Sequence, residues 1–211
     1  MNRRPLKNVD IYSDAGRLEA VYREVLDPLG VAVICHPHPL HGGTLHNKVV
    51  FRAARGLEAA DIATVRFNFR GAGASQGKHD HGEGEQRDFE AALRWIRARH
   101  PGMKAIAGGF SFGAWVASRV ACDLPEVAGV FLIGTPVDSY DFLYLGRCRK
   151  PKLFIHGSND EHGDAEKLAQ RVGTWPDSEM VLVESADHFF SDQLEVVEES
   201  LRVWATTVLE G

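Results

Sequence analysis

The sequence lacks any long run of hydrophobic residues and has few cysteines. No stretch of its 211 residues approaches the roughly 20 apolar residues that a membrane-spanning helix needs, and no apolar segment typical of a signal peptide follows the basic residues of MNRRPLKNVDIY. The three cysteines, Cys35, Cys122 and Cys148, are an odd number without close spacing, so we interpret them as small buried hydrophobic residues in a reducing compartment. These absences predict a soluble cytoplasmic protein.

An excess of positive charge is also absent. The chain has 24 lysines and arginines against 29 aspartates and glutamates, a net charge of −5, so it has no long-range attraction for nucleic acids or anionic membranes, and we expect neither as a partner. There is no internal repeat, low-complexity tract or linker rich in proline, glycine and serine. With 44% hydrophobic residues, residues 1–211 are expected to form a single domain.

Short apolar or β-branched segments alternate along the chain with longer amphipathic ones. This alternation is typical of an α/β fold, with a mostly parallel central sheet of about eight strands and helices on both faces. Strands are expected at residues 7–13, 17–25, 31–36, 62–69, 104–109, 127–134, 152–157 and 179–185. Helices are expected at residues 47–60 and 83–100, directly after Ser111, and at 163–172 and 191–210.

The sequence GFSFG, residues 109–113, stands between an apolar strand and a helix pattern. A chain that turns from strand to helix within one residue crowds the positions two residues away on either side, and here both positions, Gly109 and Gly113, lack a Cβ. The residue at the turn is exposed above the sheet, at the positive end of the following helix. Ser111 is therefore a candidate nucleophile, and the turn geometry makes the backbone N–H of Phe112 a candidate oxyanion donor.

An acid and a histidine follow two later strands. Ligands of an open parallel sheet bind beyond the carboxyl ends of its strands, and Asp160 and His188 occupy such positions. A serine hydroxyl needs a histidine to accept its proton and a carboxylate to orient that histidine. The sequence thus predicts a catalytic triad of Ser111, Asp160 and His188. Asp138, after the preceding strand, is an alternative to Asp160.

Seven motifs are spread along nearly the whole chain: CHPHPLHGG (35–43), NKVV (47–50), RFNFRGAGASQG (66–77), DHGEGEQRD (80–88), GFSFG (109–113), HGSND (156–160) and DHFF (187–190). Together they resemble the α/β-hydrolase fold, in particular its small lidless bacterial members related to dienelactone hydrolase. The resemblance implies a serine hydrolase without a cap domain, with Ser111 as nucleophile, His188 as general base and Asp160 as its orienting acid.

The family's second oxyanion donor comes from the loop after the third strand. Many members have His-Gly-X there, and X donates. This sequence has His36-Pro37-His38, so the resemblance implies the backbone N–H of His38 as donor, with Leu40 as the alternative because a proline replaces the family's glycine. Pro37 and Pro39 have no N–H to offer.

Two other functions compete with the serine hydrolase. The histidines His36, His38 and His41 have the H-x-H-x-x-H spacing of zinc-dependent hydrolases, and His46 and His81 could add ligands. Against this, Leu40 stands where such sites usually have an acid, and two prolines stiffen the loop. The second competing function is that of a binding protein that keeps the fold without catalysis. It would be favoured if a residue of the triad were missing.

The glycine-rich segment RGAGAS after a strand resembles a phosphate-binding loop but lacks its lysine and the helix start. We expect Arg70 to pack instead against loop carbonyls and the acids of residues 80–88.

Only 17 residues, Thr135–Pro151, are available where larger members of the fold insert a helical lid. They can form a loop or one short helix, so the substrate pocket should be shallow. We expect His38, Leu40, Tyr140 and Phe142 to contact the substrate, a small soluble carboxylic ester, or else a thioester or lactone. No cofactor and no metal are expected, and the protein should be a monomer or homodimer.

Overall fold

The computed structural model describes residues 3–211 and contains one eight-stranded sheet with the order β1-β2-β4-β3-β5-β6-β7-β8. The strand β2 is antiparallel to both of its neighbours, and the pairs from β4 to β8 are parallel. The strands are β1 (Arg3–Ser13), β2 (Gly16–Val25), β3 (Gly30–Cys35), β4 (Ile62–Phe67), β5 (Ala105–Phe110), β6 (Val127–Ile133), β7 (Lys152–Gly157) and β8 (Ser178–Val183).

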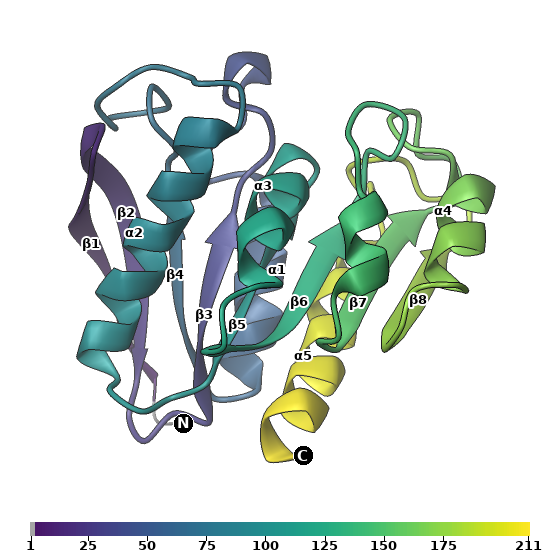
Figure 1. Cartoon of the computed structure of the whole chain (residues 1–211). Helices are drawn as coiled ribbons and strands as arrows, with labels where there is room; N and C mark the ends of the chain where they lie inside the picture. The colour runs from purple at the N-terminus through teal and green to yellow at the C-terminus, as the bar shows by residue number, and fades with distance from the viewer. Residues whose placement is uncertain (1–2) are drawn as a thin grey trace.

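Helices cover both faces of this sheet (Figure 1). One layer contains α2, α3 and α4, and the other contains α1 and α5, which pack against each other. The helices are α1 (Lys48–Ala59), α2 (Glu83–Arg99), α3 (Phe112–Ala121), α4 (Ala165–Val172) and α5 (Leu194–Glu210). Two short 3₁₀ helices, η1 (Pro39–His41) and η2 (Leu143–Arg147), lie in the loops.

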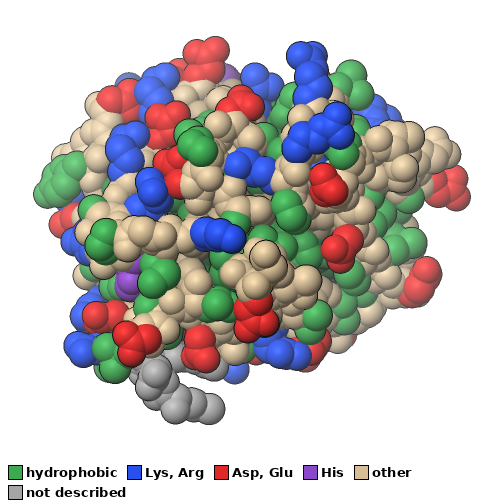
Figure 2. All heavy atoms as spheres, turned by 60° about the horizontal axis from the view of Figure 1, so that its bottom comes forward, with side chains coloured by type: hydrophobic (Ala, Val, Ile, Leu, Met, Phe, Trp, Pro, Cys, Tyr) green, Lys and Arg blue, Asp and Glu red, His purple; other side chains and the backbone are tan. Residues whose placement is uncertain are grey.

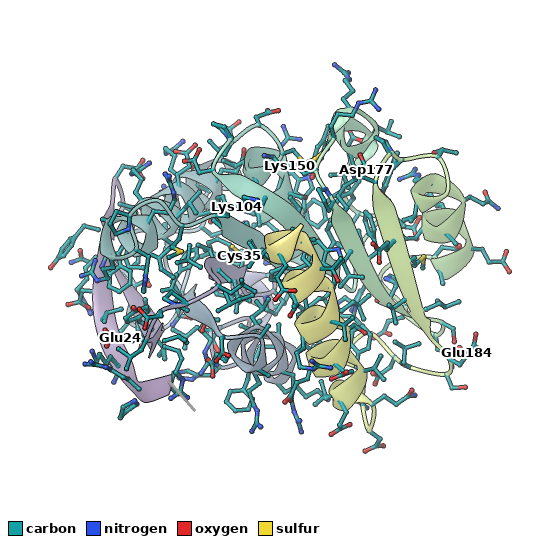
Figure 3. The ribbon with its side chains drawn as sticks, turned by 90° about the horizontal axis from the view of Figure 1, so that it is seen from below. Glu24, Cys35, Lys104, Lys150, Asp177 and Glu184 are labelled. Carbon is teal, nitrogen blue, oxygen red and sulfur yellow. A yellow bond between two sulfur atoms is a disulfide. The ribbon has the colours of Figure 1, made fainter. Side chains whose placement is uncertain are left out.

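The burial of the central strands explains this layering. Every residue of β3, β4, β5 and β7 is buried, because a parallel strand covered on both faces has no side that meets water. Figure 3 shows the molecule from the amino ends of the parallel strands, with α5 packed on one face of the sheet and Cys35 in the interior. At the opposite, carboxyl ends of the parallel strands lie the loops that contain Asp160 and His188 and the turn at Ser111.

The fold class and the absence of a cap domain are confirmed. All eight strands and five helices occur where the sequence predicted them, with ends that differ by a few residues. The largest difference is at β1, which already begins at Arg3. The segment 135–151 contains only η2, so it forms one short helix and no lid.

The interpretation of the cysteines is wrong for two of the three. Cys122 and Cys148 form a disulfide with their Cα atoms 5.4 Å apart, whereas Cys35 is free and buried. The two partners are 26 residues apart in sequence, and they meet because the chain after η2 returns to the end of α3. The disulfide therefore ties the segment that replaces the lid to the end of this helix.

The expected contact of Arg70 with the acids of residues 80–88 is confirmed, whereas within residues 3–211 its guanidinium donates to no loop carbonyl. Its guanidinium donates to both carboxylate oxygens of Asp88 in α2, at 3.0 and 2.8 Å, and to Asp14 at 2.5 Å.

Basic and acidic side chains are interspersed on the surface, as the face in Figure 2 shows. Within residues 3–211, no helix is both long and apolar enough to cross a membrane.

Candidate active site

Ser111 lies at the sharp turn between β5 and α3. Its backbone has φ 55° and ψ −120°, a left-handed conformation that is strained for a residue with a side chain. The two flanking glycines are required by close packing: a Cβ on Gly109 or on Gly113 would come within 2.5 Å of the carbonyl oxygen of Cys35. The turn therefore rests on the end of β3, next to the loop that contains His38.

His188 and Asp160 form a hydrogen-bonded pair in the loops after β8 and β7. His188 Nδ1 lies 2.9 and 2.8 Å from the two carboxylate oxygens of Asp160, and both side chains are almost completely buried. Asp160 also accepts the backbone N–H of His162 at 2.8 Å. An Nδ1–H held by a carboxylate leaves Nε2 as the free, basic nitrogen of the ring.

Close packing of these two loops brings the pair together. Ala186 accepts a hydrogen bond from the Asn159 N–H, and Ser158 Oγ accepts one from the Ser185 N–H. A Cβ on Gly157 would lie only 2.3 Å from the carbonyl oxygen of Ala186, so a glycine is needed for this contact.

Asp138, the alternative acid, lies elsewhere. Its carboxylate pairs with Lys167 and accepts the N–H of Asp164 at 2.9 Å, at the start of α4. The hydrogen bond with Lys167 lowers the pKa of Asp138. Asp138 thus stabilises a helix end on the surface, and the structure places Asp160 against His188.

Ser111 and His188 both line a cavity of about 270 Å³. Within residues 3–211 no hydrogen bond joins Ser111 Oγ to His188, a bond that in many enzymes tightens only when substrate is bound. Of the four residues expected to contact substrate, His38 and Tyr140 line the cavity. Phe142 does not, because its side chain is completely buried in the core, and Leu40 points to solvent with 69% of its surface exposed.

The cavity wall also includes His41, which the sequence offered only as a metal ligand, and several residues that the sequence did not indicate. These are Pro37, Gly42, Gly43, Asn47, Pro136, Ser139, His162 and Phe189. Each lies within a few residues of a predicted site residue or at the start of α1, so adjacency to the strand ends was the available signal.

Two backbone N–H groups, one in the loop after β3 and one at the start of α3, belong to residues that line the same cavity as Ser111. In residues 3–211 no hydrogen bond uses the N–H of His38 or that of Phe112, and both residues line the cavity. The N–H of Leu40 instead donates to His38 Nδ1 at 3.2 Å. The sequence left His38 and Leu40 open as the second oxyanion donor, and these hydrogen bonds favour His38.

The three histidines of the H-x-H-x-x-H segment do not converge on one point. His36 is completely buried and uses both ring nitrogens on the backbone: Nε2 accepts the N–H of Phe69 and Nδ1 donates to the Pro37 carbonyl. The rings of His38 and His41 are stacked, 4.5 Å apart. No group of three or more His, Cys, Asp or Glu side chains in residues 3–211 is arranged to bind a metal ion.

The chain is similar to several known proteins. The family model described as "Alpha/beta hydrolase domain" matches residues 40–208. An uncharacterized protein of Rickettsia prowazekii (strain Madrid E) is 34% identical over 92% of this chain and 86% of its own. A solved serine hydrolase homologue from Coxiella burnetii is 37% identical, with a TM-score of 0.87 over 93% of this chain and 96% of its own. A serine hydrolase without a lid from Xanthomonas campestris is 33% identical, with a TM-score of 0.88 over 98% and 96%.

His36 should make the stability of the fold depend on pH. Burial lowers its pKa from 6.5 to about 4, so between these values the unfolded chain binds more protons and stability falls as the pH falls. In urea unfolding at several pH values, the wild type should be more stable than His36→Gln above pH 6.5, and this difference should shrink toward pH 4. A stability difference between the two proteins that stays constant from pH 4 to above pH 6.5 would contradict the lowered pKa of His36.

Proposed function

The chain belongs to the alpha/beta hydrolase family, and from this premise we propose that it is a serine hydrolase that cleaves small soluble carboxylic esters through an acyl-enzyme. Thioesters and lactones are the next substrate classes. Family membership leaves the mechanism and the substrate open, because one fold hosts many reactions.

One observation carries the proposal. The buried pair of His188 and Asp160, with an oxygen to Nδ1 distance of 2.8 Å, borders the same cavity as the strained serine at the turn. A purely structural histidine would not need its ring held by a carboxylate at the wall of a cavity that it shares with a serine. Strained backbone at such a position is characteristic of functional sites.

In the first step, His188 Nε2 accepts the proton of Ser111 Oγ while this oxygen attacks the carbonyl carbon of the ester. Asp160 holds the Nδ1–H and stabilises the imidazolium that forms. The N–H groups of His38 and Phe112, the latter at the amino end of α3, donate hydrogen bonds to the negatively charged carbonyl oxygen. Collapse of this intermediate transfers the proton from His188 to the departing alcohol.

In the second step, water replaces the alcohol. His188 accepts a proton from the water, whose oxygen attacks the acyl carbon, and the same two N–H groups hold the oxyanion. The carboxylic acid leaves and Ser111 regains its proton. All proton transfers pass through one histidine, so the buried contact with Asp160 serves both halves of the reaction.

The first prediction is that Ser111 is the nucleophile. A fluorophosphonate should label the wild type at Ser111, and Ser111→Ala should lose both the label and the turnover of p-nitrophenyl acetate. Ser118, which lies seven residues further along in α3 and is buried with its Oγ bonded to the Ala114 carbonyl, provides a serine that should remain unlabelled. Undiminished turnover by Ser111→Ala would exclude the serine mechanism, and a wild type that hydrolyses none of the esters, thioesters or lactones tried would favour a binding protein.

A second prediction compares the two acids. Asp160→Asn should lower kcat by about four orders of magnitude, as loss of the orienting carboxylate does in serine proteases. Asp138→Asn is the matched control, because among residues 3–211 the Asp138 carboxylate bonds only to Lys167 and to the start of α4, and this variant should leave kcat within about twofold. Steady-state kinetics with both variants decide the assignment, and the opposite ranking would transfer the role to Asp138.

A third prediction concerns the acyl chain. The cavity is about 270 Å³ and no lid extends it, so methylenes beyond the first few stay in water and do not gain the roughly 0.8 kcal/mol that burial of each provides. For a series of p-nitrophenyl esters, kcat/KM should be highest for short or compact acyl groups and should show no increase above the micelle concentration. A steady rise toward long chains would mean that the protein has a deeper acyl site.

A further inference from the structure

A second cavity, of about 260 Å³, is lined by residues of α1 and of β1, β2 and β4. These three strands are neighbours at one edge of the sheet (Figure 1). It shares no lining residue with the candidate active site, so its use is independent of the proposed function. Its lining includes Leu6, Arg23, Phe51, Arg55, Glu58 and Arg66.

Arg66 in β4 is the unusual residue of this cavity. Only 6% of it is exposed, yet among residues 3–211 its guanidinium makes one hydrogen bond, from Nη1 to the Leu45 carbonyl at 3.0 Å, and no ion pair with a carboxylate. A guanidinium has five N–H donors, and a buried charge without a counter-ion is costly. Burial lowers the pKa of Arg66.

The same strand offers a direct comparison in Arg70, which follows the end of β4. Arg70 is 5% exposed, as deeply buried as Arg66, but it pairs with two carboxylates, Asp88 and Asp14. The chain thus neutralises one of these two buried arginines by its own acids and leaves the other facing a cavity.

Within residues 3–211 no carboxylate forms an ion pair with Arg66, although the nearby charge of Glu58 partly opposes the lowering of the Arg66 pKa. Glu58 is the acid among the lining residues, and its two oxygens are already used by Arg23 Nε at 3.2 Å and by Thr64 Oγ1 at 3.1 Å. Arg55 adds a third positive charge at the rim, shared with Glu198 at 3.4 Å. Three arginines therefore face one engaged glutamate, and the cavity carries an excess of positive charge.

We propose that this cavity binds a small organic carboxylate, with Arg66 as its main ligand. A guanidinium and a carboxylate form two parallel hydrogen bonds. The bound anion would supply the negative counter-charge that Arg66 otherwise lacks. The apolar wall selects the rest of the molecule: Phe51 lies under the guanidinium, with Cζ 5.2 Å from the ring centre, and both Phe51 and Leu6 expose about 40% of their surface. A hydrophobic substituent on the carboxylate would cover them.

Benzoate is a suitable probe, and its binding can be located by ¹H–¹⁵N NMR of the ¹⁵N-labelled protein at constant ionic strength. Titration should shift the amides of Ala54 and Arg55 and the Nε–H of Arg66 in a saturable manner, with a dissociation constant on the order of 1 mM. Arg66→Met, which keeps an apolar chain of similar length, should abolish these shifts. Arg94→Met, at a site on α2 whose arginine is 68% exposed in its side chain, should leave them unchanged.

Arg55→Gln provides a second variant at the rim, where substitution leaves the core intact, and it should weaken binding about threefold. Inorganic phosphate should bind at least about tenfold more weakly than benzoate, because it cannot cover Phe51 and Leu6. Equal binding of phosphate would overturn the carboxylate assignment. The absence of saturable shifts at Ala54 and Arg55, or benzoate shifts confined to Gly42 and Gly43 of the first cavity, would overturn the site itself.

Discussion

The packing of the turn at Ser111 against the end of β3 is the constraint on which the rest of the site depends. Gly109 and Gly113 both approach the carbonyl oxygen of Cys35 so closely that a methyl group at either position would collide with it. This contact fixes the amino end of α3 beside the loop after β3, and it thereby brings the free N–H groups of Phe112 and His38 to one cavity. The strain of the backbone at Ser111 is sustained by the surrounding sheet.

Buried polar side chains then hold the loops that the sheet alone would leave mobile. His36 joins the loop after β3 to Phe69 at the end of β4. His156 does the same on the other side of Ser111: its Nδ1 accepts the N–H of Thr135 after β6, and its Nε2 donates to the Gly163 carbonyl in the loop that contains Asp160. Since these nitrogens each have a partner, burial of the two rings does not leave an unsatisfied polar group.

Much of this arrangement could be predicted from the sequence because it follows from local patterns. The alternation of apolar and amphipathic segments determines the eight strands and five helices, and the parallel topology sends the residues after β5, β7 and β8 to the same edge. Gly-x-Ser-x-Gly is itself a local signal, because the crowding that requires both glycines is produced by a turn of a few residues.

The remaining features depend on contacts between distant segments. Asp160 and Asp138 both follow strands, and only the packing of Gly157 against Ala186 decides which one meets His188. The burial of Phe142 and the exposure of Leu40 depend on how their loops close. The disulfide joins cysteines whose spacing of 26 residues suggested no partnership.

That disulfide also explains how a hydrolase can have a defined pocket without a lid. The segment after β6 is attached to α3 at three levels: Tyr140 stacks on Trp115 at 4.6 Å, Tyr144 Oη lies 2.6 Å from Ser118 Oγ, and Cys148 is bonded to Cys122. All three contacts are with the helix that begins directly after Ser111. Because Tyr140 lines the cavity, one wall of the pocket is held by the same rigid element as Ser111. The distance between this wall and Ser111 is therefore set by the packing of α3 itself, and the shape of the pocket does not depend on the closure of a separate domain.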